Sequence, residues 1–183
     1  ERRPRSGVYL RAESQVGSLD AIVMQADLGL PFDLRESDHL SEFRSILETQ
    51  AIELACVRRT QEDIDRLDAC MSACRERFGR GESIAQPSAD FHLAVVAATH
   101  NQFLLRAANS CYLATRELRE AVFTDPTVCR RSIRDHQKIR DAIVKGSVTL
   151  ARRAMKDHLH VANHYWRTQF ASGGAAAGAA SPA

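Results

Sequence analysis

Three histidines in the sequence sit at positions where an amphipathic helix buries its side chains. His136 lies three residues after Ile133, and Ile139 and Ile143 follow it three and seven residues later. Residues at these spacings share one face of a helix. His92 and His158 have apolar neighbours at similar spacings, which are Val95, Val96, Ala151, Ala154, Met155, Ala162 and Tyr165. Imidazole is a common protein ligand for zinc, copper, iron and nickel, so three such histidines from three helices could bind a metal ion.

The same pattern also has a simpler interpretation. A single histidine on an apolar helix face is usually a core residue that is hydrogen-bonded to a neighbour. Spacing alone does not show that three side chains converge, so both interpretations stay open at this point. Cys70 and Cys74 lie one turn apart, but no second cysteine pair has ligand spacing. We expect all five cysteines to be reduced thiols within helices.

The composition indicates a soluble globular domain without a strong charge bias. The chain has 183 residues, with 25 basic and 23 acidic side chains and a net charge of +2. This balance argues against binding of nucleic acid or membrane across the whole surface. No apolar run approaches the ~20 residues that a membrane span needs, and the N-terminal residues do not resemble a signal peptide. We therefore expect a cytoplasmic protein that does not associate with a membrane.

Hydrophobic periodicity and capping signals predict the helices that would position the histidines. We expect Asp38 to cap a helix that ends near Arg59, and the segment 60–63 to form a capping box for the next helix. Gly79, Gly81 and Pro87 predict a loop. The other expected helices cover residues 16–28, 88–100, 101–122, 126–145 and 147–170. Together these segments predict an all-α, antiparallel bundle of six to seven helices.

The two ends of the chain are expected to lie outside this bundle. Residues 7–10 predict one strand of a hairpin whose partner is missing, although a flexible basic terminus would explain the same residues. The segment 171–183 contains only Gly, Ala, Ser and Pro, so we expect it to be disordered.

Several short motifs, in this order, resemble the C-terminal ligand-binding (FCD) domain of the FadR branch of GntR-type bacterial transcription regulators. The resemblance covers residues 12–170, and it is carried by Phe43-Arg44-Ser45-Ile46-Leu47-Glu48, Phe91-His92, Asn101, His136 with Ile139 and Ala142-Ile143, and Ala154-Met155-Lys156-Asp157-His158-Leu159. Residues 1–11 then resemble the end of a winged-helix DNA-binding domain that lies upstream and is absent here. The basic side chains of this wing remnant that could contact operator DNA are Arg2, Arg3 and Arg5.

The resemblance implies a divalent metal site, with zinc, nickel or manganese as the candidate ions. Its three histidine positions match His92, His136 and His158, and its fourth ligand is an aspartate four residues before the first histidine. Ser88 occupies that position here. A serine hydroxyl is a poor ligand for a divalent ion at neutral pH, so binding could be weakened or lost. Asp90 points nearly opposite to His92 on a helix and does not obviously replace it.

The resemblance also implies a small carboxylate effector in the bundle core and a homodimeric regulator. Arg44 would clamp the carboxylate, for which a guanidinium is suited, and Ser88 and Ser132 would face the same cavity. On spacing alone, Arg44 equally predicts a surface ion pair with Glu48.

Two other functions fit the same residues. Three histidines with an open coordination position are also the ligand set of a zinc hydrolase, in which Glu48 would be the general base. A helical dimerisation module without any ligand is the third alternative. No catalytic motif supports the hydrolase, so we expect a regulator domain and no enzymatic activity.

Overall fold

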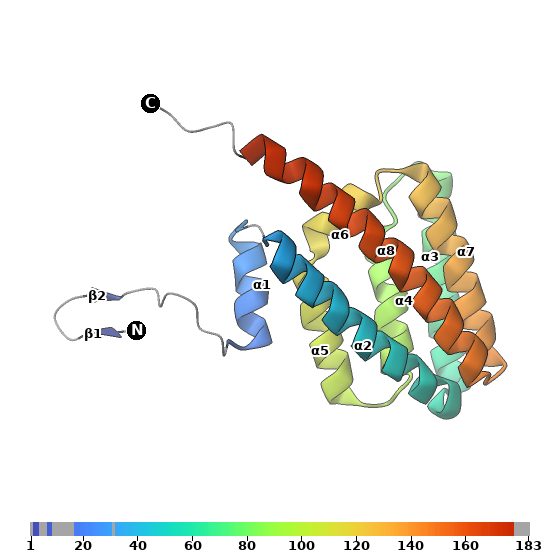
Figure 1. Ribbon diagram of the computed structural model, residues 1–183. Coiled ribbons are helices and arrows are strands. Elements are labelled where there is room, and N and C mark those ends of the chain that lie inside the picture. Colours follow the sequence, from blue (N-terminus) through green and yellow to red (C-terminus); the bar gives the residue numbers. More distant parts are fainter. Residues whose placement is uncertain (1, 4–6, 9–16, 31, 178–183) are drawn as a thin grey trace.

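The computed structural model describes residues 2–3, 7–8, 17–30 and 32–177, with side chains described for residues 17–30 and 32–165. Within these residues the chain forms eight helices and one pair of short strands (Figure 1). The helices are α1 (Leu19–Asp27), α2 (Leu34–Arg58), α3 (Gln61–Gly79), α4 (Ala85–Ala97), α5 (Gln102–Ala114), α6 (Arg116–Val122), α7 (Pro126–Val144) and α8 (Val148–Ala177). The all-α bundle is confirmed. No described helix is both long and apolar enough to cross a bilayer.

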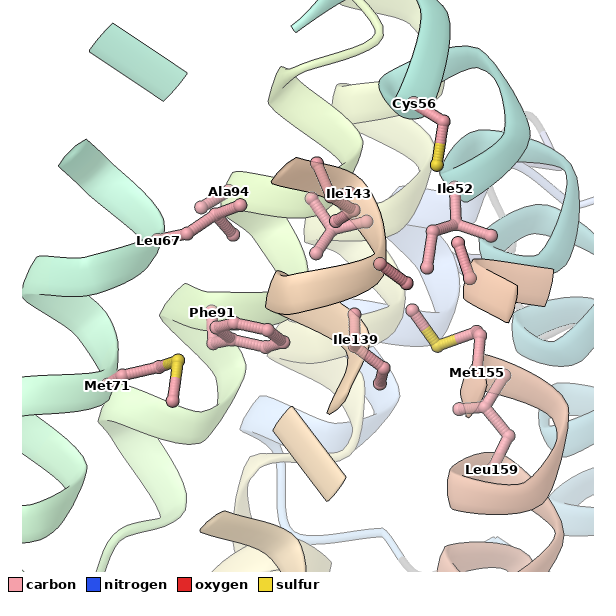
Figure 2. Packing of buried hydrophobic residues seen from close by; sticks show 13 residues of the cluster. Ile52, Cys56, Leu67, Met71, Phe91, Ala94, Ile139, Ile143, Met155 and Leu159 are labelled. Carbon is pink, nitrogen blue, oxygen red and sulfur yellow. The ribbon is translucent and has the colours of Figure 1, made fainter. Parts of the chain in front are cut away.

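The bundle is built around the helices that carry the three histidines. In Figure 1, α7 and α8 run in opposite directions, and α8 lies along α2. The main core cluster joins side chains from α2, α3, α4, α7 and α8 (Figure 2). Its fully buried members include Phe91, Ile139 and Met155. Each of them lies next to one of the three histidines in sequence or one helix turn from it. Burial of these apolar residues fixes the inner faces on which the imidazoles lie.

Helix capping explains several of the boundaries. Thr60 and Asp63 form the predicted capping box at the start of α3, with the Asp63 carboxylate accepting a 2.9 Å hydrogen bond from the Thr60 amide. Asp125 caps α7 and is followed by Pro126, which agrees with the predicted start of this helix at residue 126. The prediction that Asp38 caps α2 is wrong. Asp33 and Glu36 form a capping box there, and α2 begins five residues earlier than a cap at Asp38 would give.

Two further boundaries differ from the sequence prediction. Pro87 does not lie in a loop but in the first turn of α4, where a proline is tolerated because the backbone there needs no donor. The predicted helix over 101–122 is divided at Thr115 into α5 and α6. At this break the Arg119 guanidinium donates to the Tyr112 carbonyl and, at 2.7 Å, to the Thr115 hydroxyl.

The ends of the chain also differ from the prediction. The strand at Gly7–Val8 has its partner within the chain, because it pairs antiparallel with Arg2–Arg3. Tyr9 and Leu10 lie outside the described residues. Helix α8 continues to Ala177, so the first seven residues of the tail that was predicted to be disordered are helical. Alanine is the best helix former, and three alanines end this helix.

Candidate metal centre and effector cavity

The structure brings the three predicted histidines together in the bundle core. His92 on α4, His136 on α7 and His158 on α8 are all buried. The Nε2 atom of His92 lies 3.2 Å from that of His136 and 3.1 Å from that of His158. One ligand atom from each histidine lies within 4.8 Å of the other two. Spacing alone left open whether the three imidazoles converge, and the structure shows that they do.

A buried carboxylate orients His92 from its other side. The Nδ1 atom of His92 contacts Glu48 Oε2 at 2.5 Å. Glu48 Oε1 accepts hydrogen bonds from Arg44 Nε and from the Tyr112 hydroxyl, both at 2.7 Å. Burial opposes ionisation of Glu48, but its contacts with His92 and Arg44 hold the pKa of the carboxyl far below its ordinary value. We assign the proton to Nδ1 of His92, which leaves Nε2 with a free lone pair.

The other two histidines differ in their outer contacts. His158 Nδ1 faces the Asp135 carboxylate at 3.8 Å. Burial alone would raise the pKa of Asp135, but His158 and Lys138 lower it to about 2, so a negative charge lies beside the His158 ring. The His136 ring stacks on Phe91 with 4.2 Å between ring centroids. Its Nδ1 atom is buried and has no hydrogen-bond partner among the described residues.

These contacts fit a bound divalent cation. Burial lowers the pKa of His92 to about 4, and burial with the two neighbouring imidazoles holds that of His136 well below its ordinary value. With the proton of each ring on Nδ1, the Nε2 lone pairs face one another, and a cation between them removes their repulsion. Tetrahedral zinc with nitrogen ligands at about 2.05 Å separates those nitrogens by about 3.3 Å, close to the two observed distances. Carboxylates behind the ligand rings are the usual outer contacts of such sites.

A cavity opens beside the histidine cluster. Its volume is about 40 Å³, and it is partly open to solvent. This volume corresponds to a few water molecules and suits a small ligand. Its polar wall contains Arg44, Ser88, His92, Tyr112, Arg119, Arg131, Ser132, Asp135 and His158, and its apolar wall contains Val122, Phe123, Val128, Val161, Ala162 and Tyr165.

The three residues predicted to bind an effector all line this cavity. Ser88 and Ser132 are buried, and the Ser132 hydroxyl lies 3.4 Å from His136 Nε2. Arg44 is 5% exposed, so its contact with Glu48 is a buried ion pair and not the surface pair that spacing alone also allowed. Asp90 is exposed and accepts a hydrogen bond from Gln86, which agrees with the prediction that it does not reach the cluster.

Four polar residues of the site were not predicted in the roles that they have. Glu48 was considered as a general base or as a surface partner of Arg44, yet it is buried, both its oxygens are hydrogen-bonded and it does not line the cavity. Tyr112, Asp135 and Arg119 were not singled out. Asp135 is next to His136 in sequence, whereas Tyr112 and Arg119 lie on helices that carry no predicted site residue. No sequence signal distinguished them.

The remaining candidates lie elsewhere. His160 and His164 are exposed, as predicted, and His100 pairs with Asp63 at 3.0 Å near the start of α3. All five cysteines are unpaired, and none belongs to a metal-ligating cluster of described residues. Arg2 and Arg3 lie in the described strand β1 (Arg2–Arg3), which pairs with β2 (Gly7–Val8), and Arg5 lies outside the described residues.

Comparison with known proteins assigns the family. The FCD domain family matches residues 39–161, which is more than half of the chain. The chain belongs to the FCD domain family. The matched range contains Arg44, the three histidines and the lining of the neighbouring cavity up to Val161. The resemblance seen in the short motifs is therefore confirmed.

The relatives in sequence are regulators. The chain is 29% identical over 164 residues to the HTH-type transcriptional regulator LutR of Bacillus subtilis, covering 87% of this chain and 73% of that protein. It is 28% identical over 174 residues to the Uxu operon transcriptional regulator of Escherichia coli, covering 87% of this chain and 63% of that protein. The chain thus spans less than two thirds of the second relative. These names support a regulatory domain and confirm the prediction that the chain is not an enzyme.

Solved structures show the same fold. Escherichia coli McbR/YncC superposes with a TM-score of 0.70 at 15% identity, over 82% of this chain and 83% of that chain. Streptococcus agalactiae GntR superposes with a TM-score of 0.66 at 19% identity, over 90% of this chain and 73% of that chain. The family match, the sequence relatives and the fold together identify this chain as an effector-binding domain of the GntR type.

Proposed function

We propose that this FCD domain senses a small organic acid beside a divalent metal ion held by His92, His136 and His158. The observation that carries the proposal is the meeting of the three Nε2 atoms, with a carboxylate facing Nδ1 of two of the rings. Zinc, nickel and manganese are the candidate ions. A bound ion would supply Lewis-acid attraction for a carboxylate oxygen of the effector.

Because Ser88 supplies no carboxylate ligand, an effector carboxylate would take that place at the metal ion. The family resemblance places an aspartate ligand where Ser88 lies on the cavity wall. Three neutral imidazoles leave the charge of a divalent ion uncompensated and a coordination position open. An effector carboxylate or a water molecule would complete the shell, so Ser88 is expected to weaken metal binding without abolishing it.

Arg44 is the residue proposed to bind the effector carboxylate. Its guanidinium lines the cavity, and Nη2 lies 3.5 Å from His92 Nε2, so the same carboxylate can reach both the guanidinium and the metal position. Glu48 and Tyr112 fix the Nε side of the group, which presents the rest of the guanidinium in a preset orientation. Such preorganisation reduces the entropy lost on binding. Ser132 would add a hydroxyl contact.

The effector signal is proposed to act on DNA through an upstream winged-helix domain outside this chain. The basic N-terminal segment with Arg2, Arg3 and Arg5 would be the end of that domain's wing. Residues 12–170 would be the sensor, and the cytoplasm the place of action. In a homodimer, binding in the core would shift helices and change the spacing of two such domains on operator DNA. A coupling free energy of about 1–3 kcal/mol is enough for such control. Analytical ultracentrifugation of the chain should show a dimer, and a monomer at micromolar concentration would contradict this part of the proposal.

The effector proposal is tested by melting the zinc-loaded domain with matched ligands. We expect 2-hydroxybutyrate to raise the melting temperature, and 2-hydroxybutyramide, which lacks the negative charge, to have no effect. Arg44→Lys keeps the charge but not the planar fork, and should weaken 2-hydroxybutyrate binding about tenfold. Arg35→Lys, at an exposed position of the same helix, is the control. Equal shifts by acid and amide, or an unchanged Arg44→Lys variant, would contradict the proposal.

A further inference from the structure

The guanidinium of Arg119, on α6, is buried in the wall of the cavity and is not part of the histidine cluster. It is 5% exposed, and its Nη1 donates to the Tyr112 carbonyl and the Thr115 hydroxyl. Its Nε atom is buried and has no hydrogen-bond partner among the described side chains and backbone. Among the described residues no carboxylate forms an ion pair with it within 4.0 Å; the charge of Glu120 raises its pKa, but from beyond that distance.

The other two arginines of the cavity have carboxylate partners. Arg44 pairs with Glu48, and Arg131 lies 3.7 Å from Asp135. Burial lowers the pKa of Arg119 to about 10, so the group still carries its charge at neutral pH. A buried charge without a counter-ion is unfavourable, and an anion that enters the cavity relieves that cost. The charge balance of the cavity therefore points to an anionic group at Arg119.

The position of Arg119 is separate from the metal centre but fixed relative to it. The Cζ atoms of Arg44 and Arg119 lie 5.1 and 5.0 Å from the centroid of the Tyr112 ring. The same ring stacks with His92 at 5.7 Å between centroids. Tyr112 thus holds two guanidiniums and one histidine in a single rigid arrangement. The cavity wall contributed by α6 and the start of α7 is apolar at Val122 and Val128, which suits a hydrocarbon segment.

We propose that Arg119 is a second anion-binding residue and that the effector is a short dicarboxylate. One carboxylate would lie at the histidine cluster and Arg44, and the other would pair with the free Nε side of the Arg119 guanidinium. A spacer of a few carbon atoms would contact the apolar wall. This inference rests on the proposed function, since it takes the histidine cluster as the first binding point. It makes Arg119 the residue that distinguishes diacids from monoacids.

The test is calorimetric titration of the zinc-loaded domain with matched pairs of acids. Each pair differs by the distal carboxylate: malate with 2-hydroxybutyrate, succinate with butyrate, and glutarate with pentanoate. We expect the diacid to bind at least tenfold more tightly than its monoacid in at least one pair. In Arg119→Gln this gap should disappear, while the monoacid Kd stays within twofold and the zinc content stays unchanged.

Two further variants separate binding from folding. Arg116→Gln removes an exposed arginine of the same helix and should keep the full gap. Arg119→Lys retains the charge without the planar fork and should reduce the affinity gap at least threefold. This variant replaces Arg119→Gln in the test if the glutamine variant does not fold. Equal affinities within every pair, or a gap that persists in the folded Arg119 variants, would overturn the role of Arg119 alone. Failure of all acids to bind, or loss of zinc from the wild-type domain, would overturn the proposed function as well.

Discussion

At the scale of single residues, each imidazole of the cluster depends on the group behind it. Glu48 and Asp135 are not candidate metal ligands, because they face Nδ1 atoms and not the point where the Nε2 atoms meet. Such outer carboxylates fix the ring orientation and the tautomer, and they increase the basicity of the ligand nitrogen. Their contribution can be measured without removing a histidine.

Asp135→Asn should therefore lower zinc affinity by about tenfold or more, because His158 loses the negative charge behind its ring. Zinc affinity would be measured by competition with a chromogenic chelator at neutral pH. Asp141→Asn is the matched control, since it removes an exposed carboxylate from the same helix. The same loss in both variants would show that Asp135 acts only through the general charge of α7.

The sequence predicted the metal-ligand candidates better than the residues around them. His92, His136 and His158 could be identified because an imidazole on an apolar stripe is unusual. Glu48 and Arg119 lie on helices as ordinary charged residues, and those faces are enclosed by the packing of α2 against α4 and α5 and of α6 against α8. Burial of a charged side chain depends on neighbours that are distant in sequence, so periodicity could not show it.

At the scale of helices, local capping chemistry sets most of the boundaries. The capping box at Thr60 was predicted from the sequence. Asp125 and Gly146, which has a φ of 65°, mark the two ends of the helix that was expected over residues 126–145. The error at α2 arose because Asp33 and Asp38 are both acceptable caps by type. Glu36 decides between them, since it completes a capping box only with Asp33. The break at Thr115 depends on the buried Arg119, which the sequence did not reveal.

Asp63→Asn should lower the free energy of unfolding by about 0.5–1 kcal/mol at pH 7. Burial by itself raises the pKa of Asp63, but hydrogen bonds from Thr60 and the charge of His100 bring it below its ordinary value of 3.8. Stability from this shift is present above pH 3.8 and is lost as the pH falls through the lower folded pKa.

Urea unfolding followed by circular dichroism at pH 7 and at pH 3 would measure this difference. The gap between wild type and Asp63→Asn should shrink at the lower pH, because pH 3 lies below the ordinary pKa of 3.8 and the lowered folded pKa then contributes less stability. Asp65→Asn, at an exposed position in the first turns of the same helix, should change stability little at either pH. A gap that is independent of pH would mean that the carboxylate charge of Asp63 does not stabilise α3.

At the scale of the whole molecule, the histidine cluster and the apolar core are parts of one interior. Phe91, Ile139 and Leu159 each lie beside a histidine of the cluster in sequence or one turn from it, and all belong to the main core cluster. Packing at this density limits how far the three imidazoles can separate. The all-α class followed from the sequence because helix periodicity extends along most of it, whereas the enclosure of the cavity is a product of the assembled bundle.

Leu159→Ala should destabilise the domain by about 2–5 kcal/mol, through lost burial and the cavity that remains. Leu159 is 2% exposed, whereas Leu150 on the same helix is 52% exposed. Leu150→Ala is therefore the control and should cost less than about 0.5 kcal/mol in the same denaturation experiment. A similar loss of stability in both variants would show that α8 does not bury the side of the helix that carries Leu159.

The three-histidine metal centre is tested most directly by the metal content of the purified, untagged domain, measured by elemental mass spectrometry. We expect about one zinc, nickel or manganese ion per chain, lost in His136→Ala and kept in His164→Ala, which replaces an exposed histidine of α8. That result would establish that the site binds metal although Ser88 supplies no carboxylate. Absence of stoichiometric metal after incubation with each ion, or equal loss in both variants, would contradict the metal centre.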